Sequence, residues 1–201
     1  MKRMAWLALF LLFVAPVSLA RAAAIVGQRA PSFELRDADG KAVKLDSYRG
    51  KYVVLEWTNF GCPFVGKQYG SGNMQSLQKK YTEKGVVWLT ICSSAKGKQG
   101  YVDGAGAKEG VKERDAAPTR FLLDPKGSVG KSYGAKTTPH MFVIDPKGTL
   151  IYNGAIDDKP STNKDDVPTA KNYVAAALDE SMAGEKVAMS ATQPYGCSVK
   201  Y

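Results

Sequence analysis

Residues 51–65 read KYVVLEWTNFGCPFV and decide the fold. The apolar run from Lys51 to Trp57 predicts a strand covered on both faces, because such strands read as near-continuous hydrophobic runs. Cys62 and Pro63 follow, and proline is well tolerated at the first position of a helix. The segment therefore predicts a strand that leads to a cysteine, and a short helix from there to about Tyr69. Val65 stands where a second cysteine would complete a C-x-x-C pair.

The next segments predict a parallel unit. Glycines at 70 and 72 break the first helix, and Asn73 can cap a second helical segment that ends near Gly85. Residues 86–91 form another apolar run, so the order is strand, helix, strand, with a right-handed crossover. Cys92 closes the second strand. We expect it near the edge of the sheet where open α/β sheets hold their sites.

Antiparallel hairpins are predicted on both sides of this unit. Upstream, alternating apolar residues between Phe33 and Leu45 surround the turn signal Asp39-Gly40. Downstream, strands at 141–144 and 149–152 flank a four-residue turn. Shorter elements are expected between them, a strand at 121–123 and a helix at 129–133. Together these elements predict one α/β domain with a mixed central sheet flanked by helices.

The C-terminal third is expected to hold one helix and several irregular segments. The helix is predicted over 169–182, capped by Thr169 and stopped at Gly184. Residues 93–110 are glycine-rich and are predicted to be a surface loop, as are residues 157–166. Residues 185–201 show no clear periodicity and are predicted to be a tail, in which Cys197 is framed by Pro194 and Gly196.

Residues 1–23 are predicted to be a secretory signal peptide. Lys2 and Arg3 precede an apolar run, and small residues around Ala20 provide a cleavage site. The alternative is an uncleaved anchor, but the run is broken by Pro16 and ended by Arg21, short of the ~20 residues that span a membrane. We therefore expect a periplasmic protein that meets the membrane only through this transient segment. Residues 24–184 would be the folded domain and 185–201 its tail.

The charge of the chain argues against a nucleic-acid partner. The sequence carries 28 basic and 19 acidic residues, a formal net charge of +9. Loss of Lys2, Arg3 and Arg21 with the signal peptide would leave +6. The remaining basic residues are interspersed with acidic ones, without a basic stripe or stacking aromatics. A solvated surface accounts for this charge.

Two stretches carry a family resemblance. Residues 30–57 (APSFELRDADGKAVKLDSYRGKYVVLEW), the cysteine at a strand-to-helix turn, and residues 133–154 (YGAKTTPHMFVIDPKGTLIYNG) together resemble periplasmic thioredoxin-fold proteins of the TlpA-like and redoxin (AhpC/TSA-type) group. The resemblance covers roughly residues 27–158. It implies a thioredoxin-like fold with an N-terminal β-hairpin extension and a cis-proline, Thr138-Pro139, opposite Cys62. It also implies that His140 lies beside Cys62.

Cys62 is the predicted nucleophile. A cysteine where a strand ends and a helix begins meets free backbone N–H groups and the positive end of the helix dipole, which favour the thiolate. Glu56 lies six residues earlier, and the resemblance to thioredoxins implies a buried acid that accepts a proton at this spacing. Burial would raise its pKa toward neutrality. The alternative is a bend that lets Glu56 reach solvent or a lysine.

The thiol that pairs with Cys62 must lie elsewhere, because disulfide exchange needs a second thiol to release the mixed disulfide. Cys197 is the favoured partner, since a tail of about 17 residues can span up to ~50 Å and fold back over the site. A static Cys62–Cys197 disulfide is one alternative, and a redox role for Cys92 is another. His140 could stabilise the thiolate, carry a proton, or be purely structural.

Three functions remain open. The first is a thiol-disulfide oxidoreductase acting on a protein thiol or disulfide partner. The second is a thiol peroxidase with antioxidant activity, although the peroxiredoxin pattern P-x-x-x-T-x-x-C is not met at Leu55 and Asn59. The third is a copper-binding protein that uses Cys62, His140 and another cysteine. The favoured reading requires no cofactor or metal. The oligomeric state, the redox partner and the direction of electron flow stay open.

Overall fold

The computed structural model describes residues 24–201. The predicted signal peptide, residues 1–23, lies outside the described residues. Within the described part of the chain, no helix has the length and apolar character needed to cross a membrane.

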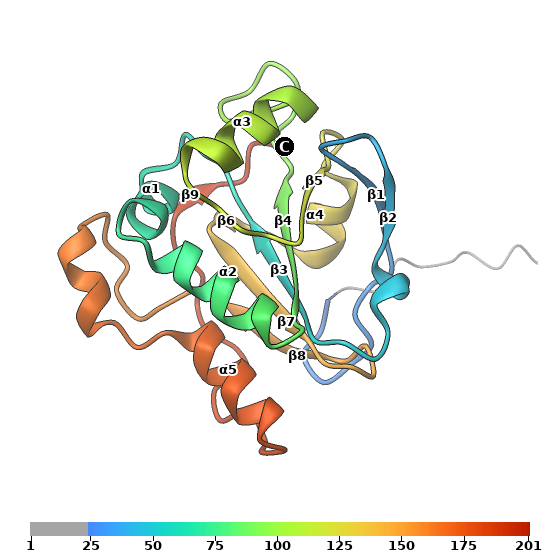
Figure 1. The fold of residues 1–201 in the computed structure, drawn as a ribbon, viewed down its shortest axis with the longest axis vertical. Coiled ribbons are helices and arrows are strands. Elements are labelled where there is room, and N and C mark those ends of the chain that lie inside the picture. Colours follow the sequence, from blue (N-terminus) through green and yellow to red (C-terminus); the bar gives the residue numbers. More distant parts are fainter. Residues whose placement is uncertain (1–23) are drawn as a thin grey trace, which may run out of the picture.

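A seven-stranded mixed sheet forms the centre of the molecule, in the order β2-β1-β5-β4-β3-β7-β8 (Figure 1). The strands β3, β4 and β5 are parallel, and the others pair in antiparallel fashion. Both predicted hairpins and the parallel unit are therefore confirmed. The strand bounds are β1 Glu34–Asp37, β2 Ala42–Lys44, β3 Val53–Trp57, β4 Val87–Cys92, β5 Arg120–Leu123, β7 His140–Ile144 and β8 Leu150–Gly154.

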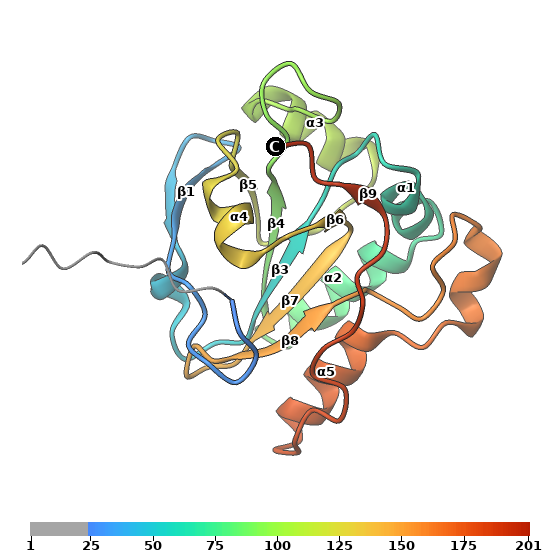
Figure 2. The ribbon, with the colours of Figure 1, turned by 180° about the vertical axis from the view of Figure 1, so that it is seen from behind.

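Helices cover both faces of this sheet. Successive side chains of a strand point to opposite faces, and those of β3 are buried on both, so each face needs a covering layer. On one face, Val54 of β3 packs in a core with α1, α2 and α5. On the other, Leu55 and Trp57 pack with α4 and with residues of the N-terminal segment. Figures 1 and 2 show these two sides. The helices are α1 Pro63–Gly70, α2 Asn73–Glu83, α3 Gly104–Glu113, α4 Ser128–Tyr133 and α5 Tyr173–Met182, with 3-10 segments at Leu45–Tyr48 and Lys164–Thr169.

The tail is ordered along the surface of the domain and forms a second, two-stranded sheet. Its strand β9 (Cys197–Ser198) pairs antiparallel with β6 (Thr137–Thr138). Figure 2 shows the tail, in red, running past β8 and along β6 toward the end of β4. Beyond β9, the Ala95 N–H donates to the Lys200 carbonyl at 2.8 Å. The last residues therefore lie against the loop that follows β4.

Two predicted helix starts are wrong. The N-cap of α2 is Gly72, with φ of 78°, and the side chain of Asn73 donates to Gln68 Oε1 at 2.6 Å instead of capping. A left-handed residue suits glycine, which has no Cβ to clash. Thr169 ends a 3-10 segment, and the cap of α5 is Asn172, whose Oδ1 accepts from the Ala175 N–H at 2.9 Å.

Two predicted loops also differ from the structure. Residues 104–113 form α3, which begins where the Asp103 carboxylate accepts the Gly106 N–H at 2.9 Å. Gly110 of α3 lies against the ring of Phe60, where a side chain would not fit. Glycine lowers helix propensity, but at this position it allows close packing. In the segment 157–166, Asp157 is buried with 1% exposure, so that loop is not wholly on the surface.

Candidate active site

Cys62 is held at the start of α1 by the turn that precedes it. The Cys62 N–H donates to the Asn59 carbonyl at 2.9 Å, and the Asn59 side chain accepts the Gly61 N–H at 2.8 Å. From the loop after β4, Gln99 Nε2 donates to the Gly61 carbonyl at 2.9 Å. Only 2% of Cys62 is exposed. The nucleophile predicted from sequence is thus fixed in place and shielded from solvent.

The segment at Thr138-Pro139 faces the sulfur of Cys62. The peptide bond between these residues is cis, as expected. The Cys62 thiol donates to the Thr138 carbonyl oxygen at 3.1 Å. The buried Thr138 therefore contacts the sulfur of the predicted nucleophile directly.

Cys197 reaches the same place from the tail. It lies directly opposite Thr138 in the β6–β9 pair, and Thr138 in turn accepts from the Cys62 thiol. Both cysteines are free thiols in this structure, and Cys197 is partly exposed. The tail thus folds back over the site as its length allowed, and brings the two sulfurs together.

The two thiols have opposite pKa shifts. Burial acts to raise the pKa of Cys62, but hydrogen bonds to its thiolate from the Cys197 thiol, from Thr138 and from the Val65 backbone outweigh burial and lower the pKa. Burial, followed by the hydrogen bond to Cys62 and its charge, raises the pKa of Cys197 to about 11. Cys62 is therefore the more acidic thiol of the pair and Cys197 the less acidic one.

Glu56 is wholly buried on the same face of β3 as Val54. Its carboxylate accepts hydrogen bonds from four neutral side chains at 2.8–3.1 Å: Tyr69, Gln78, Trp88 and Thr90. Desolvation raises its pKa, and the four donors offset that effect only in part. The alternative bend toward solvent or a lysine is wrong, because no part of Glu56 is exposed and its partners are uncharged.

His140 is engaged at both ring nitrogens. The Lys136 N–H donates to Nδ1 at 3.2 Å, and Nε2 lies 2.8 Å from Asn153 Oδ1. Since Nδ1 accepts, Nε2 carries the proton and donates to Asn153. Burial lowers the pKa of His140 to about 4, so the ring is neutral near pH 7. This geometry leaves no ring nitrogen directed at Cys62.

Comparison with known proteins assigns the chain to a family. Residues 26–153 match the model of the AhpC/TSA family, which is more than half of the chain. The chain belongs to the AhpC/TSA family. The resemblance stated from sequence is thereby confirmed. An AhpC/TSA-family chain with this mixed sheet and its flanking helices has the expected thioredoxin-like fold.

Individual relatives agree with the family assignment. The thiol-disulfide oxidoreductase ResA of Bacillus thuringiensis subsp. konkukian is 29% identical over 126 residues, which are 63% of this chain and 67% of ResA. An uncharacterised conserved protein of Geobacillus kaustophilus is 26% identical with a TM-score of 0.75, over 89% of this chain and 93% of that one. A putative thiol:disulfide interchange protein DsbE of Chlorobium tepidum is 26% identical with a TM-score of 0.52, over 65% and 85%.

The third cysteine of this AhpC/TSA-family chain lies in a separate apolar cluster. Cys92 packs with Ala107 and Phe121, and its thiol donates to the Gly100 carbonyl at 3.3 Å. Burial raises its pKa. Among residues 24–201, no three His, Cys, Asp or Glu side chains converge as a metal site requires. The ligand set suggested for copper is therefore not assembled in the described residues.

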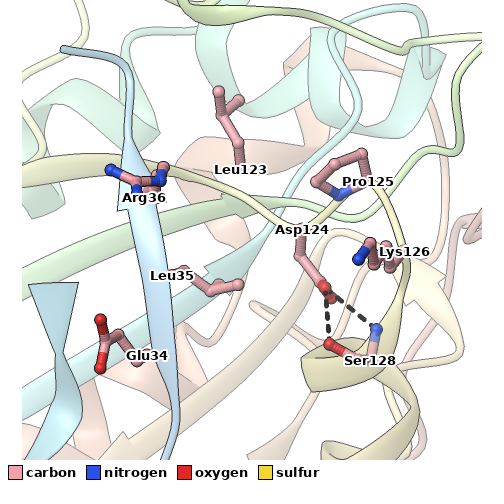
Figure 3. Close-up of a pocket in the computed structure, with 8 residues that line it drawn as sticks. All are labelled: Glu34, Leu35, Arg36, Leu123, Asp124, Pro125, Lys126 and Ser128. Atoms are coloured by element: carbon pink, nitrogen blue, oxygen red, sulfur yellow. Dashed lines mark hydrogen bonds between the residues drawn. The ribbon is translucent and has the colours of Figure 1, made fainter. Parts of the chain in front are cut away.

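A cavity of about 490 Å³ lies between β1 and the loop after β5, and neither Cys62 nor Cys197 lines it. Figure 3 shows the Asp124 side chain pointing toward Ser128. The Asp124 carboxylate accepts the N–H groups of Ser128, Val129 and Gly130 at the start of α4, at 2.9–3.1 Å. The Asp124 carboxylate therefore stabilises the start of α4, and we do not include this cavity in the candidate site.

A buried polar network beside the cysteines was not predicted from the sequence. Asp157 is buried together with Lys67, and Gln68 Nε2 donates to Asp157 Oδ2 at 2.6 Å. The phenol of Tyr195, in the tail, donates to Asp157 Oδ1. Lysine, glutamine and aspartate usually lie at the surface. The sole available signal was the pair Lys67-Gln68 within a helix of otherwise apolar and small residues.

Proposed function

We propose that this protein is a thiol-disulfide oxidoreductase in which Cys62 is the nucleophile and Cys197 the resolving thiol. The observation that carries the proposal is that Cys197 lies opposite Thr138 in the β6–β9 pair while the Cys62 thiol donates to the Thr138 carbonyl, so that two free cysteines with opposite pKa shifts lie close together. The relatives named as thiol-disulfide oxidoreductases and interchange proteins support this activity.

The first step is attack on the partner. The Cys62 thiolate attacks one sulfur of a protein disulfide, a bond forms between Cys62 and that sulfur, and the partner's second sulfur leaves with the electron pair. The leaving thiolate takes up a proton. The lowered pKa of Cys62 increases the fraction of thiolate, which is the attacking form.

The second step closes the internal disulfide. Cys197 loses its proton and attacks Cys62, the mixed disulfide breaks, and the partner's first sulfur leaves as a thiolate. The partner disulfide is thus reduced to two thiols while Cys62 and Cys197 are oxidised to one disulfide. Run backward, the same two exchanges oxidise a partner dithiol.

Proton transfer and positioning fall to the other residues of the site. Glu56, with its raised pKa, is the proton acceptor that serves the cysteine pair. Thr138 and cis-Pro139 hold the strand that receives Cys197. His140 anchors the turn next to them through Lys136 and Asn153, which makes it a positioning residue.

The proposed setting is the bacterial periplasm, reached through cleavage of residues 1–23. An oxidising compartment sustains disulfide chemistry. The partner is then a protein thiol or disulfide of the same compartment, and contact with the membrane is confined to export.

Peptide mapping of the oxidised protein tests the pairing. Diamide-treated protein should yield a peptide pair joined through Cys62 and Cys197, and dithiothreitol should abolish it. The Cys197→Ser variant is the control and should form no internal bridge. A bridge that includes Cys92, or no bridge, contradicts the proposal.

A thiol peroxidase is the second candidate, and the AhpC/TSA family match favours it. In that case peroxide would oxidise the Cys62 thiolate to a sulfenic acid with release of water, and Cys197 would condense with it to the same disulfide. The Asn59 side chain, which stands at the threonine position of the peroxiredoxin pattern, is occupied by Gly61 and Gln99. Oxidation of Cys62 by hydrogen peroxide no faster than that of free cysteine would exclude this candidate.

A further inference from the structure

The tail that carries Cys197 is fastened to the domain on both sides of the cysteine. Before it, Thr192 Oγ1 lies 2.6 Å from the Tyr152 phenol and accepts the Ala155 N–H at 2.9 Å. After it, the Tyr201 phenol donates to the Ala135 carbonyl at 2.8 Å. Between these points lies Tyr195, two residues before Cys197. The contacts of Tyr195 differ from those of Thr192 and Tyr201, because they include a buried ion pair.

The phenol of Tyr195 donates to the carboxylate of Asp157, which is 1% exposed. The other Asp157 oxygen accepts Gln68 Nε2 at 2.6 Å and lies 3.7 Å from Lys67 Nζ. The side chain of Lys67 is 0% exposed, and its ammonium also donates to the Lys159 carbonyl at 2.6 Å. A buried ion pair is costly unless further hydrogen bonds complete it. Tyr195 supplies one of these bonds.

The same residue touches the helix that presents the nucleophile. The ring of Tyr195 packs edge-on against Phe64, with centroids 5.9 Å apart, and Lys67 Nζ lies 5.7 Å from its centre. Both Phe64 and Lys67 belong to α1, whose N-cap is Cys62. The anchor at Tyr195 therefore ties the tail to the element that positions Cys62, only two residues from Cys197.

We propose that Tyr195 is a positioning residue: through Asp157 and Lys67 it docks the tail on α1 and holds Cys197 against Cys62. This inference rests on the proposed function for its consequence in exchange, while the docking itself is independent of it. Cys62 is 2% exposed beneath the docked tail, so a bulky reagent reaches it only when the tail is released.

The test compares Tyr195→Phe with Tyr52→Phe, both in a Cys92→Ser background. Tyr52 is the matched control, because its partly buried phenol donates to the Ser181 carbonyl at 2.9 Å and has no contact with the tail among the hydrogen bonds of the described residues. In reduced protein, alkylation of Cys62 by a bulky maleimide should be about tenfold faster with Tyr195→Phe, as expected for loss of one hydrogen bond to a charged group. Tyr52→Phe should leave the rate within about twofold.

The rate at which the Cys62–Cys197 disulfide closes is a second measurement, and substitution of a purely structural residue would not change it. Each protein is treated with 5,5′-dithiobis(2-nitrobenzoate), which forms a mixed disulfide on one of the pair and releases one thionitrobenzoate. The remaining thiol then attacks, closes the Cys62–Cys197 disulfide and expels the second thionitrobenzoate. We expect this second release to be about tenfold slower in Tyr195→Phe, because redocking of the tail limits it.

The outcomes separate the two proposals. Unchanged alkylation and unchanged ring closure in Tyr195→Phe would overturn the role of Tyr195. Faster alkylation, with no second release even in the parent, would support the docking role and overturn Cys197 as the resolving thiol. Equal changes in Tyr52→Phe would mean that general destabilisation is responsible, which also overturns the inference.

Discussion

Two cysteines follow adjacent parallel strands and yet have opposite chemistry. Cys62 comes after β3, and Cys92 is the last residue of β4, and both are buried. Burial acts to raise the pKa of each thiol. At Cys62 the neighbouring hydrogen bonds reverse that effect, whereas at Cys92 they do not. Burial alone therefore does not make a reactive cysteine, and the donors around the sulfur decide the outcome.

The origin of the donors explains the difference. Cys62 starts a helix and faces both the Thr138 strand end and Cys197 of the tail. Cys92 faces the apolar cluster under α3, and there burial outweighs the hydrogen bonds from Ser94 and Val102 that lower its pKa. Each thiol also donates to a carbonyl, that of Thr138 for Cys62 and that of Gly100 for Cys92, so this contact does not distinguish the two.

The largest expected effect separates these two positions directly. Cys62→Ser should lower disulfide reductase activity more than ~100-fold, because a serine hydroxyl is not ionised near neutral pH and is a poor nucleophile. Cys92→Ser should retain activity within about twofold, since its sulfur has no part in the exchange. Reduction of insulin by dithiothreitol measures both. Equal losses in the two variants would contradict the assignment of Cys62.

The next effect concerns the resolving thiol. Cys197→Ser should lose at least ~10-fold in multiple turnover but still complete the first attack, because only the release of the mixed disulfide is blocked. Intact mass spectrometry should then show the partner bound through Cys62. If the variant turns over normally and no adduct accumulates, Cys197 is not the resolving thiol.

The sequence predicted the site at Cys62 better than its surroundings, and the reason is physical. The strand, the cysteine and the proline are local signals, and periodicity places them on adjacent elements. The partners of Glu56 come from α1, α2 and β4, so they depend on packing that no local pattern encodes. The same holds for Asp157, which lies in a segment that looks like surface loop. The start of α3 was hidden because its glycines lower helix propensity, while Asp103 and close packing at Gly110 compensate.

Glu56 should give a smaller effect than Cys62, with a distinct pH signature. Glu56→Gln removes the proton acceptor but leaves Cys62 in place, so activity should fall roughly 100-fold, at the lower end of general acid–base contributions. The stability effect has a defined sign. Because burial raises the folded-state pKa above the ordinary value of 4.5, the parent loses stability as pH rises from 4.5 through that pKa. The free energy of unfolding of Glu56→Gln, measured relative to that of the parent, should therefore increase as the pH rises through this range.

Urea denaturation across pH 4–8 measures how the free energy of unfolding depends on pH. Gln78→Glu is unsuitable as a control, because it adds a second buried acid. Thr90→Val is the better control, since it removes one donor to Glu56 at 3.0 Å and keeps the carboxyl. It should steepen the pH dependence that Glu56→Gln abolishes. A pH trend shared by the parent and Glu56→Gln would show that Glu56 does not titrate in this range.

The smallest effect refines the comparison of the two thiols. Cys197→Ala removes the thiol that donates to the Cys62 thiolate, so the pKa of Cys62 should rise, by about one to two units for one hydrogen bond to a charged group. Part of the rise is offset, because a smaller side chain also relieves the burial of Cys62. The pKa of Cys92 should not change, since its donors and its apolar cluster do not involve the tail. Thiolate absorbance at 240 nm is followed against pH in Cys92→Ser with and without Cys197→Ala for Cys62, and in Cys62→Ser with and without Cys197→Ala for Cys92. A fall in the pKa of Cys62 would mean that the tail acts on this sulfur mainly by excluding water, and that the helix start and Thr138 alone make it a thiolate.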